Sequence, residues 1–367
     1  MTNKHNEPPP PQLSVHYHVN NDIFFVFEND CVLTWDYRKH QQFLLNLDYF
    51  KELQLIASTG HGNDASIDKE LLAANLISEH PYPETKWGWD VLSKIYHIGC
   101  QNVGELETGA SPAQLAEDYL EYCKQLANNM PNLYTEKPGK LIDLPPPDTT
   151  SLNKIPYFDV LKQRKTSRSF NAEPITLEQL STMLFASFGL IHGEWDEFKD
   201  LHLQATAIRK ASPASGGLHS EETYVVAYRI NGLENGLYHY RPQDHKLTLL
   251  QAGNFEDKVI SMNMSQFYSK GLACGIYITS RLDKIWWKYK HSKAYRVTML
   301  DIGHVSQTTL LTATALQLKT WMTGAFRDAE LEGFLGIDGI KETAVFFIGI
   351  GKGSGKAIPD EFLAQFG

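Results

Sequence analysis

The segment WWKYKHSKAYR, residues 286–296, gathers aromatic and basic side chains in a chain whose formal net charge is −9. In it, Lys288 and Tyr289 stand side by side behind Trp286 and Trp287. Taken alone, the segment is best explained as a solvated loop with an aromatic anchor, because lysine stems readily cover apolar surface. That interpretation does not explain why so acidic a chain gathers this many cations and aromatic rings in one short stretch.

The segment RKTSRSF, residues 164–170, carries side chains that suit a phosphate group: Arg164, Lys165, Thr166 and Arg168. Guanidinium groups form strong, bidentate, charge-assisted hydrogen bonds with phosphate oxygens, and a hydroxyl adds a further donor. An ordinary basic helix end is the alternative, because cations near a helix C-terminus complement its dipole.

Two glycine-containing loops could let backbone approach a ligand closely. FFIGIGKGSGK, residues 346–356, runs from an apolar strand into Gly351 and Lys352. Its spacing fits neither a P-loop nor GxGxxG, so a flexible surface turn explains it equally well. ASPASGGLHSEE, residues 211–222, contains small residues whose N–H groups could meet a flat or anionic ligand, and a plain loop is again the alternative.

A long helix is predicted over residues 294–318, with one face marked by spacings of three and four. Gly303 lies on that face, where something planar could lie against the backbone. For His304 the favoured interpretation is a buried core histidine.

Length and composition limit the possible functions. At 367 residues with 42% hydrophobic side chains, the chain can build two domains with substantial cores. The acidic balance argues against nucleic acid as a partner, because a phosphate backbone needs a basic face. No apolar signal segment or membrane span is found, so we expect a cytoplasmic protein without membrane contact. Four scattered cysteines predict neither a metal site nor disulfides.

The pattern of elements predicts two folded parts. Short apolar runs over 13–19, 23–29 and 31–37 predict strands, and helical spacing follows over 40–58. After residue 156 helices alternate with bunched strands, which is an α+β pattern with a mostly antiparallel sheet. The chain is predicted to begin with a disordered tail over 1–12, followed by a winged-helix- or peptide-clamp-like domain with its helices over 13–135. A proline-rich extended connector over 136–156 then leads to an α+β domain over 157–367.

Five separated segments occur in one order over about 155–355: RKTSRSF…PITLEQLSTMLFASFG, SPASGGLHSEETYVVAYRINGLENGLYHYRP, KYKHSKAYRVTMLDIGHVSQ, GAFRDAELEGFLGID and GIGKG. In order and phrasing they resemble the nitroreductase superfamily, and within it the SagB/ThcOx-type flavin dehydrogenases. The resemblance implies an α+β nitroreductase-like fold that binds FMN at a homodimer interface. The residues before 136 resemble, more loosely, the winged-helix peptide-clamp modules of larger members.

Carried over by position, the resemblance implies three sets of FMN contacts. The phosphate and ribityl chain would be held by Arg164, Lys165, Thr166 and Arg168, joined by Gly351 and Lys352. A loop of the partner subunit would supply Pro213, Ala214, Ser215 and Gly216. Backbone at Ile302 and Gly303 would pack against the isoalloxazine edge.

The resemblance also implies a role for the Lys288–Tyr289 pair. Dehydrogenases of this type use such a pair beside the flavin to oxidise thiazoline or oxazoline rings to azoles in a ribosomally synthesised, post-translationally modified peptide. Lys288 would remove the ring proton, Tyr289 would orient or relay it, and dioxygen would reoxidise the flavin. The expected partners are the precursor peptide and a cyclodehydratase complex.

Some positions depart from the family pattern. Asp301 stands where glutamate is common, Thr308 where asparagine is frequent, and SKAYR replaces the usual RGYR. These changes surround Lys288 and affect the choice of substrate. Two other functions therefore stay open: an NAD(P)H-dependent nitroreductase or flavin reductase of broad specificity, and a flavin-free scaffold subunit of a modification complex.

Overall fold

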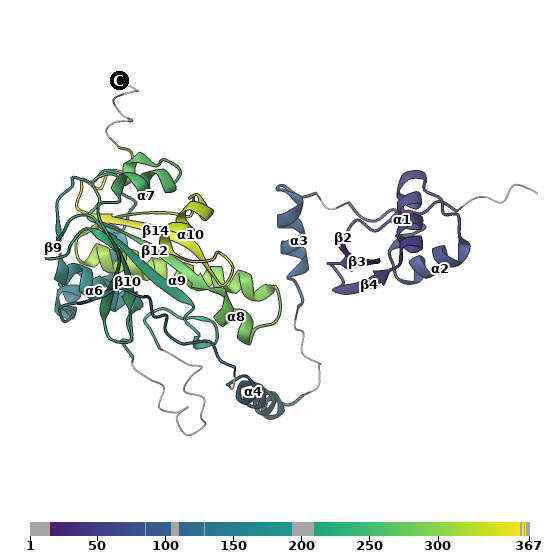
Figure 1. Ribbon diagram of the computed structural model, residues 1–367, viewed down its shortest axis with the longest axis horizontal. Helices are drawn as coiled ribbons and strands as arrows, with labels where there is room; N and C mark the ends of the chain where they lie inside the picture. The colour runs from purple at the N-terminus through teal and green to yellow at the C-terminus, as the bar shows by residue number, and fades with distance from the viewer. Residues whose placement is uncertain are drawn as a thin grey trace, which may run out of the picture. The chain divides into compact units, whose positions relative to one another are not determined.

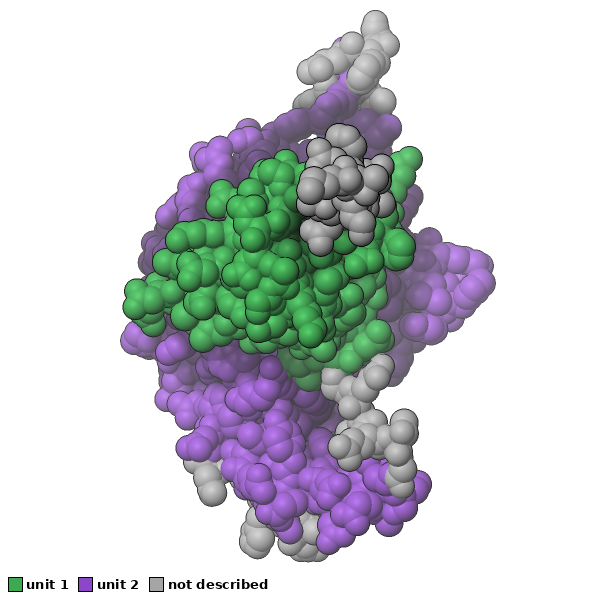
Figure 2. Space-filling model, turned by 90° about the vertical axis from the view of Figure 1, so that its right-hand side faces the viewer, with its two compact units in different colours: residues 1–106, 291–293 green, residues 107–290, 294–367 purple. Residues whose placement is uncertain are grey.

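The computed structural model describes residues 15–84, 86–103, 110–127, 129–192 and 209–359, with Phe362 and Ala364. The chain divides into unit 1, residues 1–106 with 291–293, and unit 2, residues 107–290 with 294–367 (Figure 2). The tail predicted over 1–12 lies outside the described residues.

Unit 1 combines a small antiparallel sheet with short helices (Figure 1). Its described elements are β1 (His18–Val19), β2 (Ile23–Glu28), β3 (Cys31–Asp36), β4 (Gln41–Leu45), α1 (Leu47–Thr59), α2 (Ala65–Ala73), β5 (Ile77–Ser78) and α3 (Val91–Gly99). The sheet has the order β2-β3-β4, and β1 pairs with β5. Leu53, Ile56 and Leu71 of the two helices pack with Leu76 in a core. The assignment of this part as a winged-helix-like module stays a prediction.

One predicted helix of unit 1 is wrong in its first part. The helix predicted over 40–58 begins only at Leu47, because Gln41–Leu45 form β4. β4 pairs with β3 along its whole length, and Asn46 then caps α1 by accepting from the N–H groups of Asp48 and Tyr49. The apolar spacing over 43–47 is compatible with either element, and pairing with a neighbouring strand decided between them.

Unit 2 is built on a seven-stranded sheet of order β13-β14-β12-β8-β10-β11-β6, in which every neighbouring pair is antiparallel. Its described elements are α4 (Pro112–Ala127), β6 (Lys140–Asp143), η1 (Thr149–Lys154), α5 (Tyr157–Gln163), β7 (Ile175–Thr176), α6 (Leu177–Phe188), η4 (Ser215–Gly217), β8 (Glu221–Ala227), β9 (Ile230–Asn231), β10 (Gly236–Arg241), β11 (Lys246–Ala252), α7 (Glu256–Met262), η5 (Phe267–Ser269), β12 (Cys274–Arg281), α8 (Leu282–Lys288), α9 (Lys293–Ala315), β13 (Lys319–Thr323), α10 (Asp328–Leu335) and β14 (Glu342–Gly351).

Helices cover both faces of this sheet (Figure 1). Alternate strand residues point to opposite faces, so neighbours such as Tyr224 and Val225 of β8 enter different cores. One core joins Val225 to α6 and α9, through residues such as Met183 and Val305. The other joins Tyr224 to α7 and α10. The predicted α+β fold with a mostly antiparallel sheet is confirmed.

The proline-rich stretch 136–156 differs from the extended connector that its sequence predicts. Lys140–Asp143 form β6 at the edge of the main sheet, paired with β11, and Thr149–Lys154 form the short helix η1. A strand as short as β6, with four residues, cannot show a periodic pattern in the sequence. Its structure depends on backbone pairing with β11, about a hundred residues later in the chain. Helix α4, predicted to lie in the domain over 13–135, belongs instead to unit 2.

The described residues contain neither a membrane-spanning helix nor a group of metal-binding side chains. No helix there combines the length and apolar character needed to cross a bilayer. No three histidine, cysteine, aspartate or glutamate side chains in that part of the chain are grouped so as to hold a metal ion.

Candidate functional site

Lys288 is the last residue of α8, a short helix that follows β12 directly. An ion pair fixes its start, with Nε and Nη2 of Arg281 each 2.7 Å from an oxygen of Asp283. Trp287 packs into an apolar cluster with Leu218. Lys288 is also buried, with 3% of its surface exposed. The candidate base is therefore enclosed by protein, unlike a lysine of a solvated loop.

The loop over 213–216 brings its backbone to Lys288 and Tyr289. Lys288 Nζ donates a long hydrogen bond to Gly216 O, at 3.5 Å. Gly216 has φ of 59°, and a Cβ there would lie 2.5 Å from Tyr289 Oη and 2.9 Å from Lys288 Nζ. The backbone conformation therefore favours glycine at this position, and a Cβ there would displace the tips of both side chains.

Ser215 fastens the same loop to α9. Its N–H donates to Oδ2 of Asp301 at 2.8 Å, and its hydroxyl donates to Oδ1 at 3.2 Å. Burial raises the pKa of the Asp301 carboxyl, while the two hydrogen bonds from Ser215 act in the opposite direction. We call Lys288, Tyr289, Ser215, Gly216 and Asp301 the Lys288 centre. It brings an amine, a phenol and a carboxyl into one set of contacts.

Tyr289 is the second half of the predicted pair. Burial raises the pKa of its phenol, and the positive charge of Lys288 opposes that rise. The phenol therefore keeps its proton at neutral pH. A neutral phenol beside an amine can donate a hydrogen bond to it or pass a proton along.

The loop that carries Ser215 and Gly216 is anchored at its base by buried charges. Lys210 Nζ lies 2.8 Å from Glu221 Oε1, and both side chains are buried. The lysine ammonium holds the pKa of the Glu221 carboxyl well below its usual range, against the opposing effect of burial. Between these ends, the hydroxyl of Ser212 bonds to that of Thr308 on α9, at 2.7 Å.

A second buried lysine lies one helical turn before Lys288. Lys284 Nζ donates to the carbonyl oxygens of His219 and Leu133, at 2.9 and 3.1 Å. Burial lowers the pKa of Lys284 to about 8, and the nearby carboxylate of Glu222 opposes that change. Lys284 therefore ties the end of the loop to the segment that leads into β6.

The predicted contacts of α9 lie next to the Lys288 centre. Ile302 is fully buried in the core between the sheet and α9, whereas a Cβ at Gly303 would meet no atom within 4 Å. The helix backbone is therefore open at Gly303. His304 contradicts the expectation of a core histidine, because half of its side chain is exposed and its Nδ1 lies 3.4 Å from Pro213 O.

The residues predicted to bind phosphate gather at the edge of the sheet formed by β13. Thr166 forms a parallel bridge with Thr320, and Ser167 N donates to Thr320 O at 2.8 Å. On the other side, Arg168 N donates to Lys356 O at 2.8 Å. The segment after α5 is therefore held between β13 and the chain that follows β14.

Glycines explain how closely these backbones approach. A Cβ at Gly353 would lie 2.0 Å from Ser169 O, so no side chain fits there. Above Gly355 the stems of Lys165 and Lys319 converge, with their Cε atoms 3.5 and 3.6 Å from the position of a Cβ. The loop after β14 is thus a packed element, in contrast to the flexible turn that its composition also suggested.

We call Arg164, Lys165, Arg168, Lys319 and Lys352 the basic edge. Arg168 contacts the Ala357 carbonyl at 3.0 Å and stacks on the ring of Tyr268. Lys352 lies 3.8 Å from Glu173, and both side chains are largely exposed. Within the described residues, the other four members have no carboxylate within 4 Å. Their charges are available to an anion.

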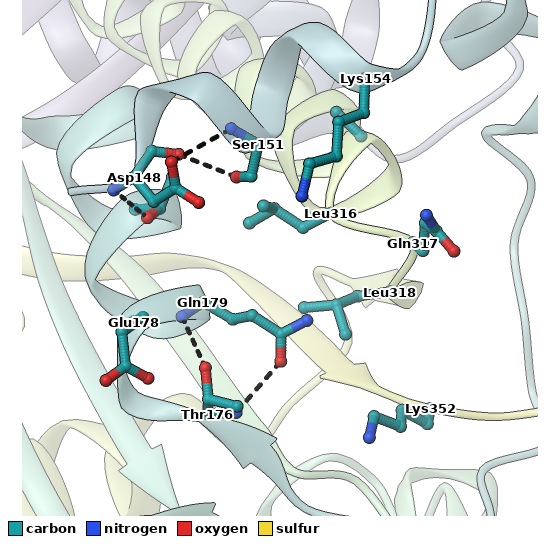
Figure 3. A pocket seen from close by; sticks show the side chains of 12 residues that line it. Asp148, Ser151, Lys154, Thr176, Glu178, Gln179, Leu316, Gln317, Leu318 and Lys352 are labelled. Carbon is teal, nitrogen blue, oxygen red and sulfur yellow. Dashed lines mark hydrogen bonds between the residues drawn. The ribbon is translucent and has the colours of Figure 1, made fainter.

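A hollow of about 650 Å³ adjoins the basic edge (Figure 3). It lies between η1, the start of α6 and the end of α9, and Lys154 and Lys352 reach toward it from opposite sides. Asp148 and Glu178 supply carboxylates to the same walls. The hollow does not include the Lys288 centre, which lies near the other end of α9.

The structure brings the predicted site residues together in two groups. Lys288 and Tyr289 meet the loop 213–216 and the Gly303 turn of α9, whereas the basic edge lies beyond the last turn of that helix. From Asp301 to Ala315 the helix rises about 21 Å at 1.5 Å per residue. One chain therefore holds the first group against the middle of α9 and the second beyond its C-terminal end.

Sequence reasoning missed two members of this arrangement. Lys319 opens β13, an edge strand that the sequence pattern did not reveal, and its position follows from pairing with β14. Asp301 was noticed only as a departure from a family pattern, and its binding of Ser215 depends on a contact across 86 residues. An isolated acidic residue on the buried side of a predicted helix was the available signal.

Comparisons with known proteins agree with this fold. The chain matches the nitroreductase family over residues 161–352, which is more than half of its length. The chain belongs to the nitroreductase family. The matched segment contains the basic edge and the Lys288 centre, while residues 1–106 of unit 1 and α4 lie outside it.

Two curated relatives and one solved structure extend the nitroreductase comparison. MJ1384 of Methanocaldococcus jannaschii, named a nitroreductase, is 27% identical over 216 residues, which cover 58% of this chain and 98% of the relative. The trifolitoxin-processing protein TfxB of Rhizobium leguminosarum bv. trifolii is 30% identical over 142 residues, 38% of each chain. A nitroreductase structure from Anabaena variabilis shares the fold with a TM-score of 0.50 and 23% identity, covering 68% of this chain and 50% of that one.

Proposed function

We propose that this nitroreductase-family protein is an FMN-dependent dehydrogenase that oxidises azoline rings, thiazoline or oxazoline, to azoles in a ribosomally synthesised, post-translationally modified peptide. One observation carries the proposal: the amine of Lys288, the hydroxyl of Tyr289 and the backbone of Gly216 meet beside the open Gly303 turn of α9. A proton acceptor is thereby fixed next to a surface that can receive a flat ring.

The basic edge fits the phosphate of FMN. Apart from Lys352, its cations lack carboxylate partners among the described residues, and Lys165 and Lys319 converge over Gly355, where no side chain intervenes. We assign the phosphate and ribityl contacts to Arg164, Lys165, Thr166, Arg168, Gly351 and Lys352. Pro213, Ala214, Ser215 and Gly216 would meet the flavin ring, together with the backbone at Ile302 and Gly303.

A homodimer would complete this site. In one chain the loop 213–216 contacts the middle of α9 at Asp301, whereas the phosphate contacts lie beyond the C-terminal end of that helix, about 20 Å away along its axis. A flavin held by both groups would take its phosphate contacts from one protomer and the loop from its partner. The exposed apolar side chains Tyr157, Phe158 and Leu161 of α5, beside the basic edge, offer surface for such an interface.

Within this site, Lys288 and Tyr289 have separate roles in proton transfer. Bound FMN supplies the two-electron acceptor for the ring hydride and is returned to its oxidised form by dioxygen. Lys288 takes the proton from the ring carbon through Nζ, and Tyr289 orients or relays that proton through Oη. Asp301 holds Ser215, and thereby Gly216, against the amine.

A peptide substrate is supported by the similarity to the trifolitoxin-processing protein and by unit 1. One face of the sheet in unit 1 exposes Val26 of β2 and Leu44 of β4, which both align with Leu33 of β3. Such an apolar surface can hold an extended peptide or a scaffold protein. We expect a cyclodehydratase complex as partner, because a cyclodehydratase makes the azoline that this reaction consumes.

A second candidate is an NAD(P)H-dependent nitroreductase or flavin reductase of broad specificity. The similarity to MJ1384 favours it, because 98% of that protein, which is named a nitroreductase, is matched by 58% of this chain. A flavin-free scaffold is the third candidate, and the unpaired cations of the basic edge count against it.

The test is the visible spectrum of the purified full chain, followed by anaerobic mixing with a synthetic peptide that contains one thiazoline. We expect a flavin band that the thiazoline peptide bleaches without NAD(P)H. The same peptide carrying a thiazole is the matched control and should leave the band unchanged. Bleaching by NAD(P)H alone would replace the proposal with the reductase, and absence of a flavin band would replace it with the scaffold.

A further inference from the structure

Helix α4, Pro112–Ala127, lies outside the segment that matches the nitroreductase family, yet it packs against the Lys288 centre. One side of the helix carries Tyr119, Tyr122, Cys123 and Leu126, at the i, i+3, i+4 and i+7 spacing of a single face. Leu126 joins the apolar cluster of α8, and Cys123 is buried. This face brings two tyrosines to the candidate base.

Tyr122 contacts the backbone of Lys288. Its hydroxyl donates a hydrogen bond to the Lys288 carbonyl oxygen. Lys288 is the last residue of α8, and the final carbonyl groups of a helix lack partners within it. Tyr122 therefore satisfies one of these groups from outside the helix, and it fixes the point from which the lysine side chain extends.

Tyr119 contacts the other end of the same side chain. The ammonium of Lys288 lies 5.4 Å from the centre of the Tyr119 ring and 5.8 Å from that of Tyr289. Both distances are within the range of cation–π attraction. The Tyr119 hydroxyl hydrogen-bonds with Cys123, which fixes the ring. About half of the Tyr119 side chain remains exposed, so the ring borders the solvent at this point.

The contact between the Tyr119 ring and Lys288 is important because the amine has few other partners. A buried ammonium is costly unless it is paired, and among the described residues no carboxylate lies within 4 Å of Lys288 Nζ. The described contacts of the amine are the distant carbonyl of Gly216 and the two tyrosine rings. Without Tyr119, one ring and one long hydrogen bond remain.

We propose that Tyr119 and Tyr122 of α4 are positioning residues for Lys288, the first through its ring and the second through its hydroxyl. This inference depends on the proposed function in one respect, that Lys288 removes a proton from the substrate. It extends the site beyond the family segment, and it makes the chain between unit 1 and the main sheet part of the site.

The test measures the amine directly, without substrate. The full chain with bound FMN is treated with an amine-acylating ester, and modification of Lys288 is followed by peptide mass spectrometry relative to exposed Lys290. Tyr119→Leu should raise the rate of Lys288 acylation about tenfold, the order expected for loss of one desolvated cation–π contact. Tyr119→Phe keeps the ring and should stay within twofold of the wild type. Equal rates in the wild type and Tyr119→Leu would overturn the role of Tyr119.

Two further variants separate positioning from simple covering. Tyr122→Phe removes one hydroxyl and should raise acylation by a smaller factor, while an unchanged rate would overturn the role of Tyr122. Leu126→Ala loosens the packing of α4 without touching either tyrosine. If it raised acylation as much as Tyr119→Leu, the helix would be a cover and the ring would have no specific role.

Turnover supplies the second measurement. Tyr119→Leu should lower kcat for azoline oxidation and keep its flavin, because the ring no longer fixes the amine opposite the substrate carbon, with recovery in Tyr119→Phe. If the wild type does not oxidise azolines, the proposed function fails, while the acylation rates still decide the role of the tyrosines.

Discussion

The Lys288 centre and the basic edge both depend on lysines, but the protein holds these lysines in opposite ways. Lys288 is buried, and a carbonyl and two rings surround its amine. At the basic edge, Lys165 and Lys319 lay their stems over Gly355. Within the described residues, no carboxylate approaches either charge. A group that must take a proton from one atom needs a fixed position, whereas a group that binds an anion needs an available charge.

The largest effects should come from removing one cation from each region and comparing the activity and flavin content that are lost. Lys288→Ala should lower azoline oxidation by about 10²–10⁴-fold, the usual contribution of a general base, while FMN stays bound. Arg164→Ala should instead lower the flavin content per chain, and excess FMN should restore its turnover. Flavin absorbance after gel filtration and turnover with added FMN measure the two quantities. Unchanged turnover in Lys288→Ala, or full flavin loading in Arg164→Ala, would contradict the assignment concerned.

The next effect concerns stability. Glu221→Ala leaves the buried ammonium of Lys210 without its partner, and it should lower the free energy of unfolding by about 3–5 kcal/mol. The double variant Lys210→Met with Glu221→Leu removes both charges and should cost much less. Lys165→Ala at the basic edge is the surface control, with an expected change within about 0.5 kcal/mol. Urea unfolding measures the stability of all three variants. If Glu221→Ala were at least as stable as the double variant, this account would be contradicted.

A smaller, pH-dependent effect should come from Lys284. Its pKa is about 8 in the folded chain, against 10.5 for an ordinary lysine. Between these values the unfolded chain holds the proton and the folded chain does not, so the free energy of unfolding rises with pH. At about 1.4 kcal/mol per pH unit, the wild type should gain about 3 kcal/mol relative to Lys284→Met from pH 8 to 10.5. Lys290→Met, at an exposed position, should instead follow the wild-type curve, and parallel curves for Lys284→Met would disprove the shift.

Much of the architecture was predictable because it depends on local pattern. The apolar run within β8 and the long spacing of α9 are visible in the sequence. The elements that were missed, such as β6, β13 and β4, depend on pairing with strands elsewhere in the chain. β6 and β13 are edge strands of four and five residues, too short to show a period.

The site was predictable in its parts and only partly in its assembly. The Lys288–Tyr289 pair and the cations near Arg164 could be selected by residue type and family resemblance. Contacts across long sequence separations could not be predicted, such as that of Tyr122 with Lys288 over 166 residues. The preference for glycine at position 216 likewise appears only when the side chains opposite it are known.

The ion pair between Lys210 and Glu221 has a consequence for ligand binding. It joins the two ends of the segment that carries Ser215 and Gly216, and Asp301 holds that segment near its middle. The loss of chain entropy needed to order these backbone groups is therefore incurred while the protein folds, before any ligand arrives. A ligand that meets this loop encounters donors and acceptors already in place, and its affinity is not reduced by the cost of ordering them.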